Sequence, residues 1–223
     1  MSKAIVLLSG GMDSLVCAGV AMAEATEVSF LHLDYGQKTS TKERESFLKI
    51  AAYYKIPASR QKIIDMAFLR QIGGSSLTDD SISVKQFQGD SEVIPDSYVP
   101  FRNSIILSLA VSWAEVMGAH RLYIGANFED SPGYPDCRPE YYQAFNEVVR
   151  LGTKAGNIRV ETPIIRAKKK DIVLKGKELK VPFELSWSCY QSTDLACGTC
   201  DSCAIRLRGF AEAGMKDPIS YRN

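Results

Sequence analysis

The stretch Ala4-Ile5-Val6-Leu7-Leu8-Ser9-Gly10-Gly11-Met12-Asp13-Ser14 decides the fold of this 223-residue chain. Its apolar run ends at Leu8 and is too short for a membrane span or for the core of a signal peptide, so it predicts a buried strand. The two glycines that follow permit a tight turn, and a helical pattern begins at about Met12. Strand, glycine turn and helix in this order predict the first unit of an α/β fold.

The same alternation continues along the first two-thirds of the chain. The sequence predicts helices at 12–25, 41–54 and 104–117, and strands at 4–8, 28–33, 61–64 and 122–125. Strands that alternate with helices imply right-handed crossovers and parallel pairing. The predicted fold class is therefore α/β, with a doubly wound, mostly parallel sheet that helices cover on both faces.

Two long segments interrupt the alternation. Residues 73–100 are rich in Ser, Asp and Gln, and a loop of this length inside a domain is typically a lid, a binding loop or a disordered stretch. Residues 128–139 follow a predicted strand, so they lie where ligands bind in open α/β sheets, beyond the carboxyl ends of the strands.

After Pro163 the character of the sequence changes. A basic helical stretch at 168–180 precedes a group of cysteines, and a last helix is expected near 204–213. We therefore predict an α/β domain over residues 1–165 and a small helical, metal-binding region over residues 166–223.

The composition narrows the range of partners. Lys and Arg number 27 against 26 Asp and Glu, which gives a net charge of +1. A protein held mainly by phosphate backbone contacts usually carries a basic excess, so no stable nucleic-acid partner is expected. The lack of a long apolar segment predicts a cytoplasmic protein with no membrane association and with reduced thiols.

The loop from Ser9 to Ser14 has the residue types and the position of an anion-binding site. Backbone N–H groups at a helix N-terminus point at a bound phosphate, and the Ser9 and Ser14 hydroxyls add donors. Asp13 can contact a magnesium ion or hold the loop in shape. A capped tight turn is the plainer alternative, whereas the Walker P-loop and the dinucleotide fingerprint need other spacings. The full Ser-Gly-Gly-x-Asp-Ser pattern resembles the pyrophosphate loop (PP-loop) of the N-type ATP pyrophosphatases, which adenylate substrates and release pyrophosphate.

Four of the six cysteines lie within fifteen residues, at Cys189, Cys197, Cys200 and Cys203. Four thiolates at this spacing are the ligand set of a closed tetrahedral zinc site, so we predict one structural Zn²⁺ per chain. An iron–sulfur cluster also takes four cysteines, but no proline follows Cys203 as it does in bacterial ferredoxins. The role of Cys137 is left open.

With both motifs in place, the chain resembles the QueC family of 7-cyano-7-deazaguanine (preQ0) synthases over essentially its full length. The matching stretches are Leu8-Ser9-Gly10-Gly11-Met12-Asp13-Ser14, Tyr35-Gly36-Gln37, Val99-Pro100-Phe101-Arg102-Asn103, Gly133-Tyr134-Pro135-Asp136-Cys137-Arg138-Pro139-Glu140, Thr162-Pro163, Trp187-Ser188-Cys189-Tyr190 and the run from Cys197 to Cys203. Residues 128–132 follow the family pattern more loosely.

The resemblance implies an adenine nucleotide alpha-hydrolase-like fold and a carbon–nitrogen ligase of queuosine biosynthesis. The family converts 7-carboxy-7-deazaguanine and ammonia to the nitrile with ATP and Mg²⁺, through adenylated acid and amide intermediates. It also suggests a homodimer. The alternative is a PP-loop paralogue that adenylates another substrate, such as a tRNA-modifying enzyme or a defence-system component.

The resemblance also implies roles for individual residues. ATP binding is expected at Leu8, Ser9, Gly10, Gly11, Met12, Asp13, Ser14 and Gln37, and catalysis at Asp13, Ser14, Arg102 and Lys169. Substrate binding is expected at Phe101, Arg102, Asn103, Glu129, Asp130, Tyr134, Asp136 and Arg138. A guanine edge presents adjacent N–H donors to a carboxylate, so one of the three acidic residues is expected to read the base, with Tyr134 or Phe101 stacked on its ring.

Overall fold

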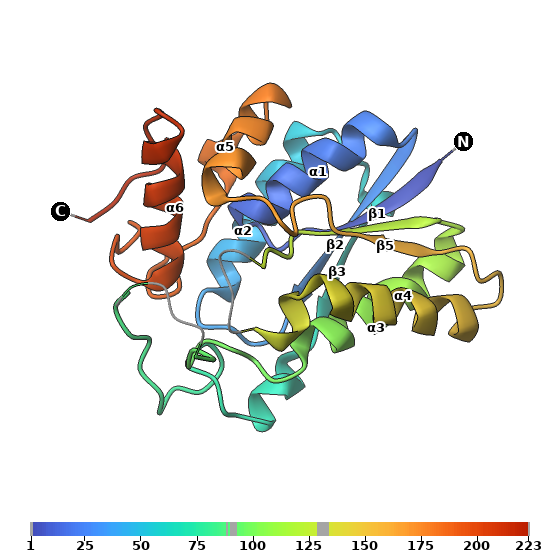
Figure 1. The fold of residues 1–223 in the computed structure, drawn as a ribbon, viewed down its shortest axis with the longest axis horizontal. Coiled ribbons are helices and arrows are strands. Elements are labelled where there is room, and N and C mark those ends of the chain that lie inside the picture. The colour runs from blue at the N-terminus through green and yellow to red at the C-terminus, as the bar shows by residue number, and fades with distance from the viewer. Residues whose placement is uncertain (1, 88, 90–92, 129–133, 223) are drawn as a thin grey trace.

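Five parallel strands form the sheet in the part of the chain that the computed structural model describes, which is residues 2–87, 89, 93–128 and 134–222 (Figure 1). The strands are β1 (Lys3–Leu7), β2 (Glu27–Asp34), β3 (Gln61–Asp65), β4 (Arg121–Ile124) and β5 (Arg159–Glu161). Their order across the sheet is β3-β2-β1-β4-β5, with every neighbouring pair parallel. The predicted α/β class and parallel sheet are confirmed.

Six α-helices connect and flank these strands in the described residues. They are α1 (Met12–Glu24), α2 (Ser40–Tyr53), α3 (Arg102–Met117), α4 (Pro139–Gly152), α5 (Lys169–Glu178) and α6 (Asp201–Glu212). Short 3₁₀ turns lie at Ala58–Arg60, Ala67–Gln71, Pro135–Cys137 and Phe183–Leu185. Helix α4 and strand β5 were not predicted from the sequence.

Strand β1 lies at the centre of the sheet and is buried on both faces. Ala4 and Val6 point into one core, where they meet α1 and α2, whereas Ile5 and Leu7 point into a second core with α3 and α4. Figure 1 shows these two pairs of helices on opposite sides of the strands. Burial on both faces explains why the strand is a continuous apolar run instead of an alternating one.

The order in which successive strands are added to the sheet reverses at β1. The chain moves outward from β1 to β2 and β3, and β4 then pairs on the other side of β1. Ligands of open α/β sheets bind at such a switch point, at the carboxyl ends of the strands. Gly125 follows β4 directly, and a Cβ there would lie 2.6 Å from the backbone nitrogen of Ser14. A glycine is therefore required where β4 meets the start of α1.

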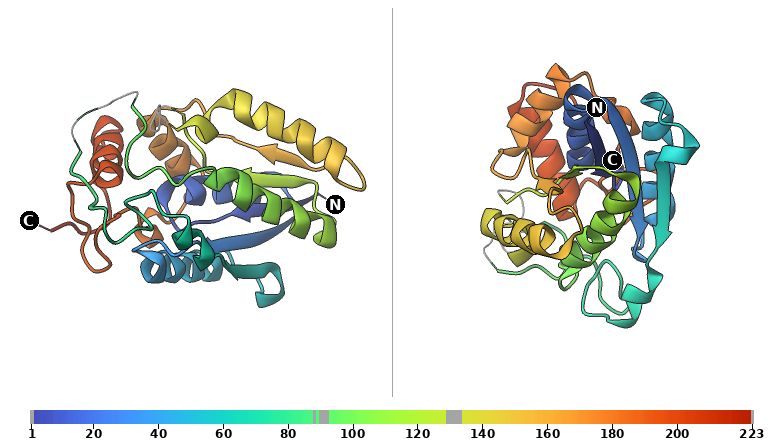
Figure 2. Two further views of the ribbon diagram at one scale, coloured as in Figure 1. Left: turned by 90° about the horizontal axis from the view of Figure 1, so that it is seen from below. Right: turned by 90° about the vertical axis from the view of Figure 1, so that its right-hand side faces the viewer.

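The last part of the chain packs onto the sheet half. Ile172 of α5 and Phe210 of α6 are buried in the same core as Leu15 of α1. Figure 2 places α6 near the end of the molecule that lies opposite the N-terminus. The predicted domain boundary at residue 165 stays a prediction. No helix in the described part of the chain is long and apolar enough to span a membrane.

Candidate functional site

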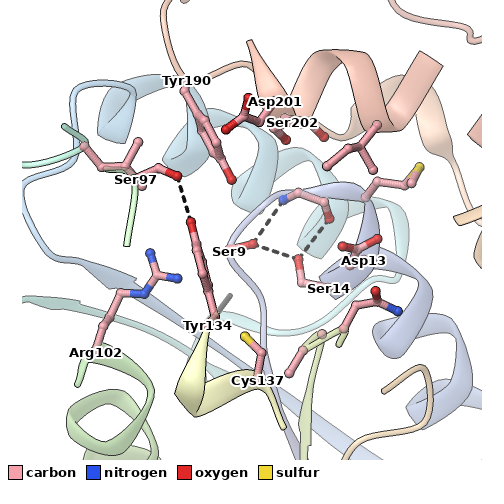
Figure 3. Close-up of a pocket in the computed structure, with 18 of the residues that line it drawn as sticks. Ser9, Asp13, Ser14, Ser97, Arg102, Tyr134, Cys137, Tyr190, Asp201 and Ser202 are labelled. Atoms are coloured by element: carbon pink, nitrogen blue, oxygen red, sulfur yellow. Dashed lines mark hydrogen bonds between the residues drawn. The ribbon is translucent and has the colours of Figure 1, made fainter. Parts of the chain in front are cut away.

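A cavity of about 360 Å³ opens at the carboxyl ends of β1 and β4 (Figure 3). One wall is the loop from Ser9 to Ser14, which we call the phosphate loop. A second wall comes from the start of α3 and the turn Pro135–Cys137. The third comes from residues 187–206, which we call the cysteine region. Segments far apart in sequence therefore meet around one cavity.

Internal hydrogen bonds fix the shape of the phosphate loop. The Ser14 hydroxyl donates to the Gly11 carbonyl at 2.9 Å, and the Gly11 amide donates to Ser9 Oγ at 3.2 Å. Gly10 has a φ of +93°, and a Cβ there would lie 2.6 Å from the backbone oxygen of Glu43. Because α1 begins at Met12, its first N–H groups have no partner within the helix and can bind an anion.

Lys169 brings a positive charge to this loop from the start of α5. Its Nζ lies 2.9 Å from each carboxylate oxygen of Asp13, and its side chain is only 9% exposed. Asn127 fixes the segment before Lys169. Its side-chain nitrogen, Nδ2, donates hydrogen bonds to the backbone carbonyls of Ile164 and Ala167. The structure thus joins two residues that are 156 positions apart in the sequence.

Arg102 supplies a second cation on the opposite side of the cavity. Its guanidinium lies over the Tyr35 ring, 5.1 Å from the centroid, and donates to the Tyr35 hydroxyl at 2.9 Å. Burial raises the pKa of that hydroxyl to about 12, although the charge of Arg102 opposes the shift. Arg102 is thus held beside a neutral ring in the cavity wall, where its guanidinium N–H groups can donate to a ligand.

Glu43 is a carboxylate that lines the cavity near Arg102. It accepts hydrogen bonds from Thr39 Oγ1 and Gln37 Nε2, both at 2.8 Å. Burial raises the pKa of this carboxyl, and the two hydrogen bonds act in the opposite direction. The Gln37 side-chain oxygen also accepts a hydrogen bond from the Tyr35 backbone amide. The hydrogen bonds among these residues therefore hold the end of β2 in place.

Asn103 joins the start of α3 to the turn Pro135–Cys137. Its backbone N–H donates to Asp136 Oδ2 at 3.1 Å, and its side-chain Nδ2 donates to the Asp136 backbone carbonyl at 2.9 Å. Tyr134 and Cys137 line the cavity, and the Tyr134 hydroxyl hydrogen-bonds with Ser97 at 2.8 Å (Figure 3). Burial, followed by the charge of Asp136, raises the pKa of the Cys137 thiol to about 12.

Most of the predicted site residues line this one cavity. These are Leu8, Ser9, Gly11, Met12, Asp13, Ser14, Arg102, Asn103, Tyr134 and Lys169. Glu129 and Asp130 lie outside the described residues. The assignment of roles among all of them stays a prediction.

Other predicted residues do not reach the cavity wall. Gln37 is buried behind Glu43, and Asp136 is buried with its carboxylate turned to the start of α3. Phe101 is 63% exposed, because it precedes α3 in a left-handed conformation, and Arg138 is exposed before α4. Their predicted ligand contacts therefore gain no support from the geometry.

Several cavity residues were not singled out from the sequence. Tyr35 and Glu43 come from the end of β2 and the start of α2, whereas Tyr190, Asp201 and Arg206 come from the cysteine region. Tyr35, Tyr190 and Asp201 lie in stretches that match the family pattern, but no role was predicted for them. The position of Tyr35 just after a buried strand was a further signal, since ligand-binding residues gather at strand ends.

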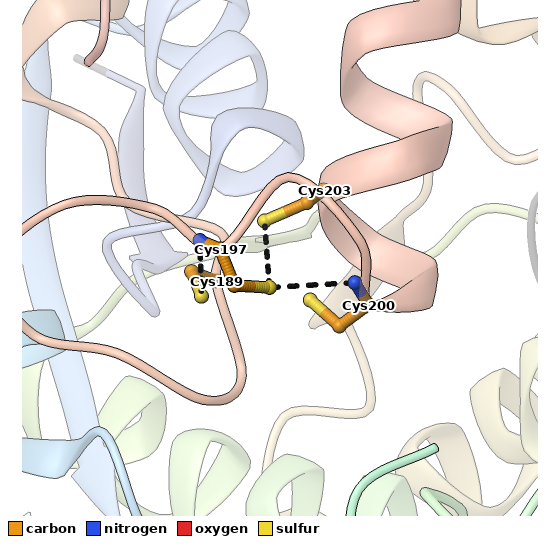
Figure 4. Close-up of side chains that lie close together, drawn as sticks. All are labelled: Cys189, Cys197, Cys200 and Cys203. Carbon is orange, nitrogen blue, oxygen red and sulfur yellow. Dashed lines mark hydrogen bonds between the residues drawn. The ribbon is translucent and has the colours of Figure 1, made fainter. Parts of the chain in front are cut away.

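The four cysteines form a compact group beside the cavity (Figure 4). All four sulfur atoms lie within 4.8 Å of one another, and those of Cys197 and Cys203 are 3.9 Å apart. Metal–sulfur bonds of about 2.3 Å in a tetrahedron place the sulfurs about 3.8 Å apart. Backbone amides of Gln191 and Cys197 point at the Cys189 sulfur, which suits a thiolate. The group fits a metal centre.

Comparison with known proteins gives matches over nearly the whole chain. The family model described as "Queuosine biosynthesis protein QueC" matches residues 3–214. A 7-cyano-7-deazaguanine synthase of Chlorobium phaeobacteroides (strain DSM 266) is 56% identical over 220 residues, covering 98% of this chain and 96% of the relative. A second, of Chloroherpeton thalassium, is 53% identical and covers 99% of this chain and 97% of the relative.

Solved structures support the fold alone. A 4-thiouridine synthetase in complex with RNA and ATP has a TM-score of 0.50 at 20% identity, covering 80% of this chain and 40% of that one. The U34-tRNA thiolase NcsA of Methanococcus maripaludis, with its [4Fe-4S] cluster, has a TM-score of 0.51 at 16% identity, covering 86% and 60%. At these identities the α/β architecture is shared, and nothing about the substrate follows.

Proposed function

The chain belongs to the QueC family, and we propose on that basis that its cavity converts 7-carboxy-7-deazaguanine and ammonia to 7-cyano-7-deazaguanine (preQ0) with ATP. It is a 7-cyano-7-deazaguanine synthase of queuosine biosynthesis. One observation carries the proposal: relatives of that name match at more than half of all positions along nearly the whole chain, the phosphate loop and the cysteine region included.

The reaction needs two activations. The carboxylate attacks the α-phosphorus of ATP, releases pyrophosphate and becomes an acyl-adenylate. Ammonia then displaces AMP and gives the amide. The amide oxygen attacks the α-phosphorus of a second ATP and releases a second pyrophosphate. Loss of that oxygen as AMP, with both protons leaving the nitrogen, forms the nitrile.

Negative charge develops on the phosphates in both activations. The N–H groups at the start of α1 and the Ser14 hydroxyl hold the leaving pyrophosphate, and Mg²⁺ accompanies the ATP. Lys169 neutralises the phosphate oxygens beside Asp13, and Arg102 faces the other end of the cavity. The close pair of Lys169 with Asp13 supports this assignment, because it fixes the ammonium at the loop.

The remaining parts of the proposal concern the metal and the assembly. Zn²⁺ is the metal that four closely spaced thiolates favour, held by Cys189, Cys197, Cys200 and Cys203 with no open position. A bound Zn²⁺ would stabilise the fold of the cysteine region and take no part in the chemistry. We propose a homodimer as the active assembly, on the family resemblance alone.

The test is mass spectrometry of the products made from the carboxylic acid, from the amide and from tRNA. We expect nitrile from both small substrates, with AMP and pyrophosphate as the nucleotide products and half as much ATP consumed from the amide. Asp13→Asn should abolish nitrile formation, whereas Glu147→Gln, an equal charge loss on the exposed face of α4, should not. Modification of tRNA without turnover of either small substrate would favour a PP-loop paralogue instead.

A further inference from the structure

The cysteine region does more than close the end of the molecule, because its residues form one wall of the cavity. Ser188 and Tyr190 flank the ligand Cys189, and Asp201 and Ser202 separate Cys200 from Cys203. These cavity residues alternate with the cysteines along the chain. Any group that binds the four sulfurs therefore fixes the backbone of the residues that face the ligand.

Tyr190 directly follows the ligand Cys189 in the chain. It lies in a tight turn in which the Gln191 amide donates to the Cys189 sulfur at 3.4 Å. Its side chain packs against the small core formed by Trp187, Ala196 and the cysteines. The Tyr190 backbone is thus tied directly to a metal ligand.

The Tyr190 ring is presented to the opposite wall of the cavity. Figure 3 shows it projecting from the cysteine region toward the side that carries Tyr134 and Arg102. The wall formed by the phosphate loop provides hydroxyls, amides and the Asp13–Lys169 pair, which suit phosphates. Aromatic rings suit a flat heterocycle, because a base stacks on a π-face whatever its edge carries.

We propose that the four-cysteine centre positions Tyr190 as an aromatic contact for the deazaguanine base, so that the metal is coupled to base binding and not only to stability. This inference rests on the proposed function. Because coupling between two binding events is reciprocal at equilibrium, the bound base must also raise the affinity of the four cysteines for the metal.

Equilibrium binding of 7-carboxy-7-deazaguanine and of ATP, measured separately by calorimetry, tests the contact. Tyr190→Leu should weaken binding of the base on the order of tenfold, whereas Tyr190→Phe should bind it nearly as the wild type does. The ATP dissociation constant and the zinc content should be unchanged in both variants.

Tyr221→Leu is the matched control. Tyr221 packs against the same cysteines but lies outside the cavity lining, so its loss should leave base binding unchanged. Equal weakening by Tyr190→Leu and Tyr221→Leu, or an unchanged base affinity in Tyr190→Leu, would overturn the inference. A wild-type protein that binds no base would instead contradict the proposed function.

The coupling is tested by equilibrium competition for zinc with a chromogenic chelator. Saturating base should raise the zinc affinity of the wild type several-fold, and Tyr190→Leu should remove that effect while the zinc affinity without base stays the same. An equal rise with the base in both proteins would show that Tyr190 does not connect the two sites.

Discussion

The phosphate loop and the cysteine region face each other across one cavity, yet different interactions hold them in place. The phosphate loop stands between β1 and α1, whose residues Ile5, Val6, Leu15 and Val16 are fully buried. The cysteine region has one small core of its own, made largely of Trp187, Ala196 and the cysteines. Hydrophobic burial fixes the first wall, and the second depends on what binds its sulfurs.

This difference separates the binding of phosphates from the formation of the opposite cavity wall. A loop held by a sheet should bind phosphates wherever the sheet is folded, whereas we expect a wall that contains a metal centre to form fully only when its metal is bound. The two walls touch directly, because the Trp187 amide donates to the Gly10 carbonyl at 2.8 Å. Changes in the cysteine region can therefore reach the phosphate loop through one backbone hydrogen bond.

Metal removal should have the largest effect on stability, and it should destabilise the cysteine region and not the phosphate loop. Binding of structural zinc to four thiolates contributes on the order of ten kcal/mol of apparent free energy to a folded site. After chelation, hydrogen exchange should show lost protection in residues 187–205, with β1 and α1 still protected. Cys200→Ser should act the same way and lower the yield of soluble protein. Simultaneous loss of protection in β1 would instead make the two walls one cooperative unit.

The buried ion pair of Arg206 with Asp217 should have the next largest effect. The guanidinium is 1% exposed, and its Nε and Nη2 donate to Asp217 at 2.7 and 2.9 Å. Asp217→Ala leaves a buried charge without its carboxylate, which should cost about 3–5 kcal/mol in urea denaturation. The exposed pair of Asp194 with Arg222 provides the control, since Asp194→Ala should cost less than about 1 kcal/mol. Similar losses in both variants would show that the buried pair contributes no more to the stability of this wall than the exposed pair does.

The parts of the fold that the sequence predicted are those with a local signal. The run from Ala4 to Leu8 is apolar because both faces are buried, and the glycines after it mark the turn. Strand β5 reads only Arg-Val-Glu, too short for any periodicity, and it is a strand because it pairs with β4. Helix α4 is an exception, because it begins with a proline, a common first helical residue, and its apolar pattern is strongly amphipathic. Its signal was present in the sequence and was missed.

The site residues also divide into those with a local sequence signal and those without one. The phosphate loop and the four cysteines are contiguous motifs, so residue type and spacing were enough to predict them. The direction of the Asp136 side chain depends on the position of Asn103, more than thirty residues away, and no spacing rule contains that contact. Tyr190 was unassigned for a related reason, because only the packing of the cysteine region turns its ring toward the cavity.

A methyl group at Gly125 should disturb the phosphate loop by steric overlap alone. The Cβ of Gly125→Ala would meet backbone atoms of Asp13 and Ser14 between 2.6 and 2.9 Å away. We expect a stability loss of about 1–3 kcal/mol and a large loss of pyrophosphate release, because the loop must move. Gly152→Ala, which has open space around it, should change neither. An active Gly125→Ala enzyme would show that the loop tolerates displacement.

The smallest expected effect concerns Cys137, a thiol in the same cavity whose state is set by burial instead of a metal. Its pKa of about 12 leaves roughly a thousandfold less thiolate at neutral pH than an ordinary cysteine has. Since the thiolate is the reactive form, alkylation of Cys137 by iodoacetamide should be slow at pH 7.

The rate of that alkylation should rise tenfold per pH unit and still be rising at pH 10, whereas a thiol peptide levels off near its own pKa. Peptide mass spectrometry of the metal-loaded protein follows Cys137 separately from the cysteines of the metal centre. A plateau by pH 9 would show that the group ionises easily, and Cys137 would then be a candidate nucleophile. Continued rise fits a thiol that shapes the cavity beside Asn103 and forms no bond to the substrate.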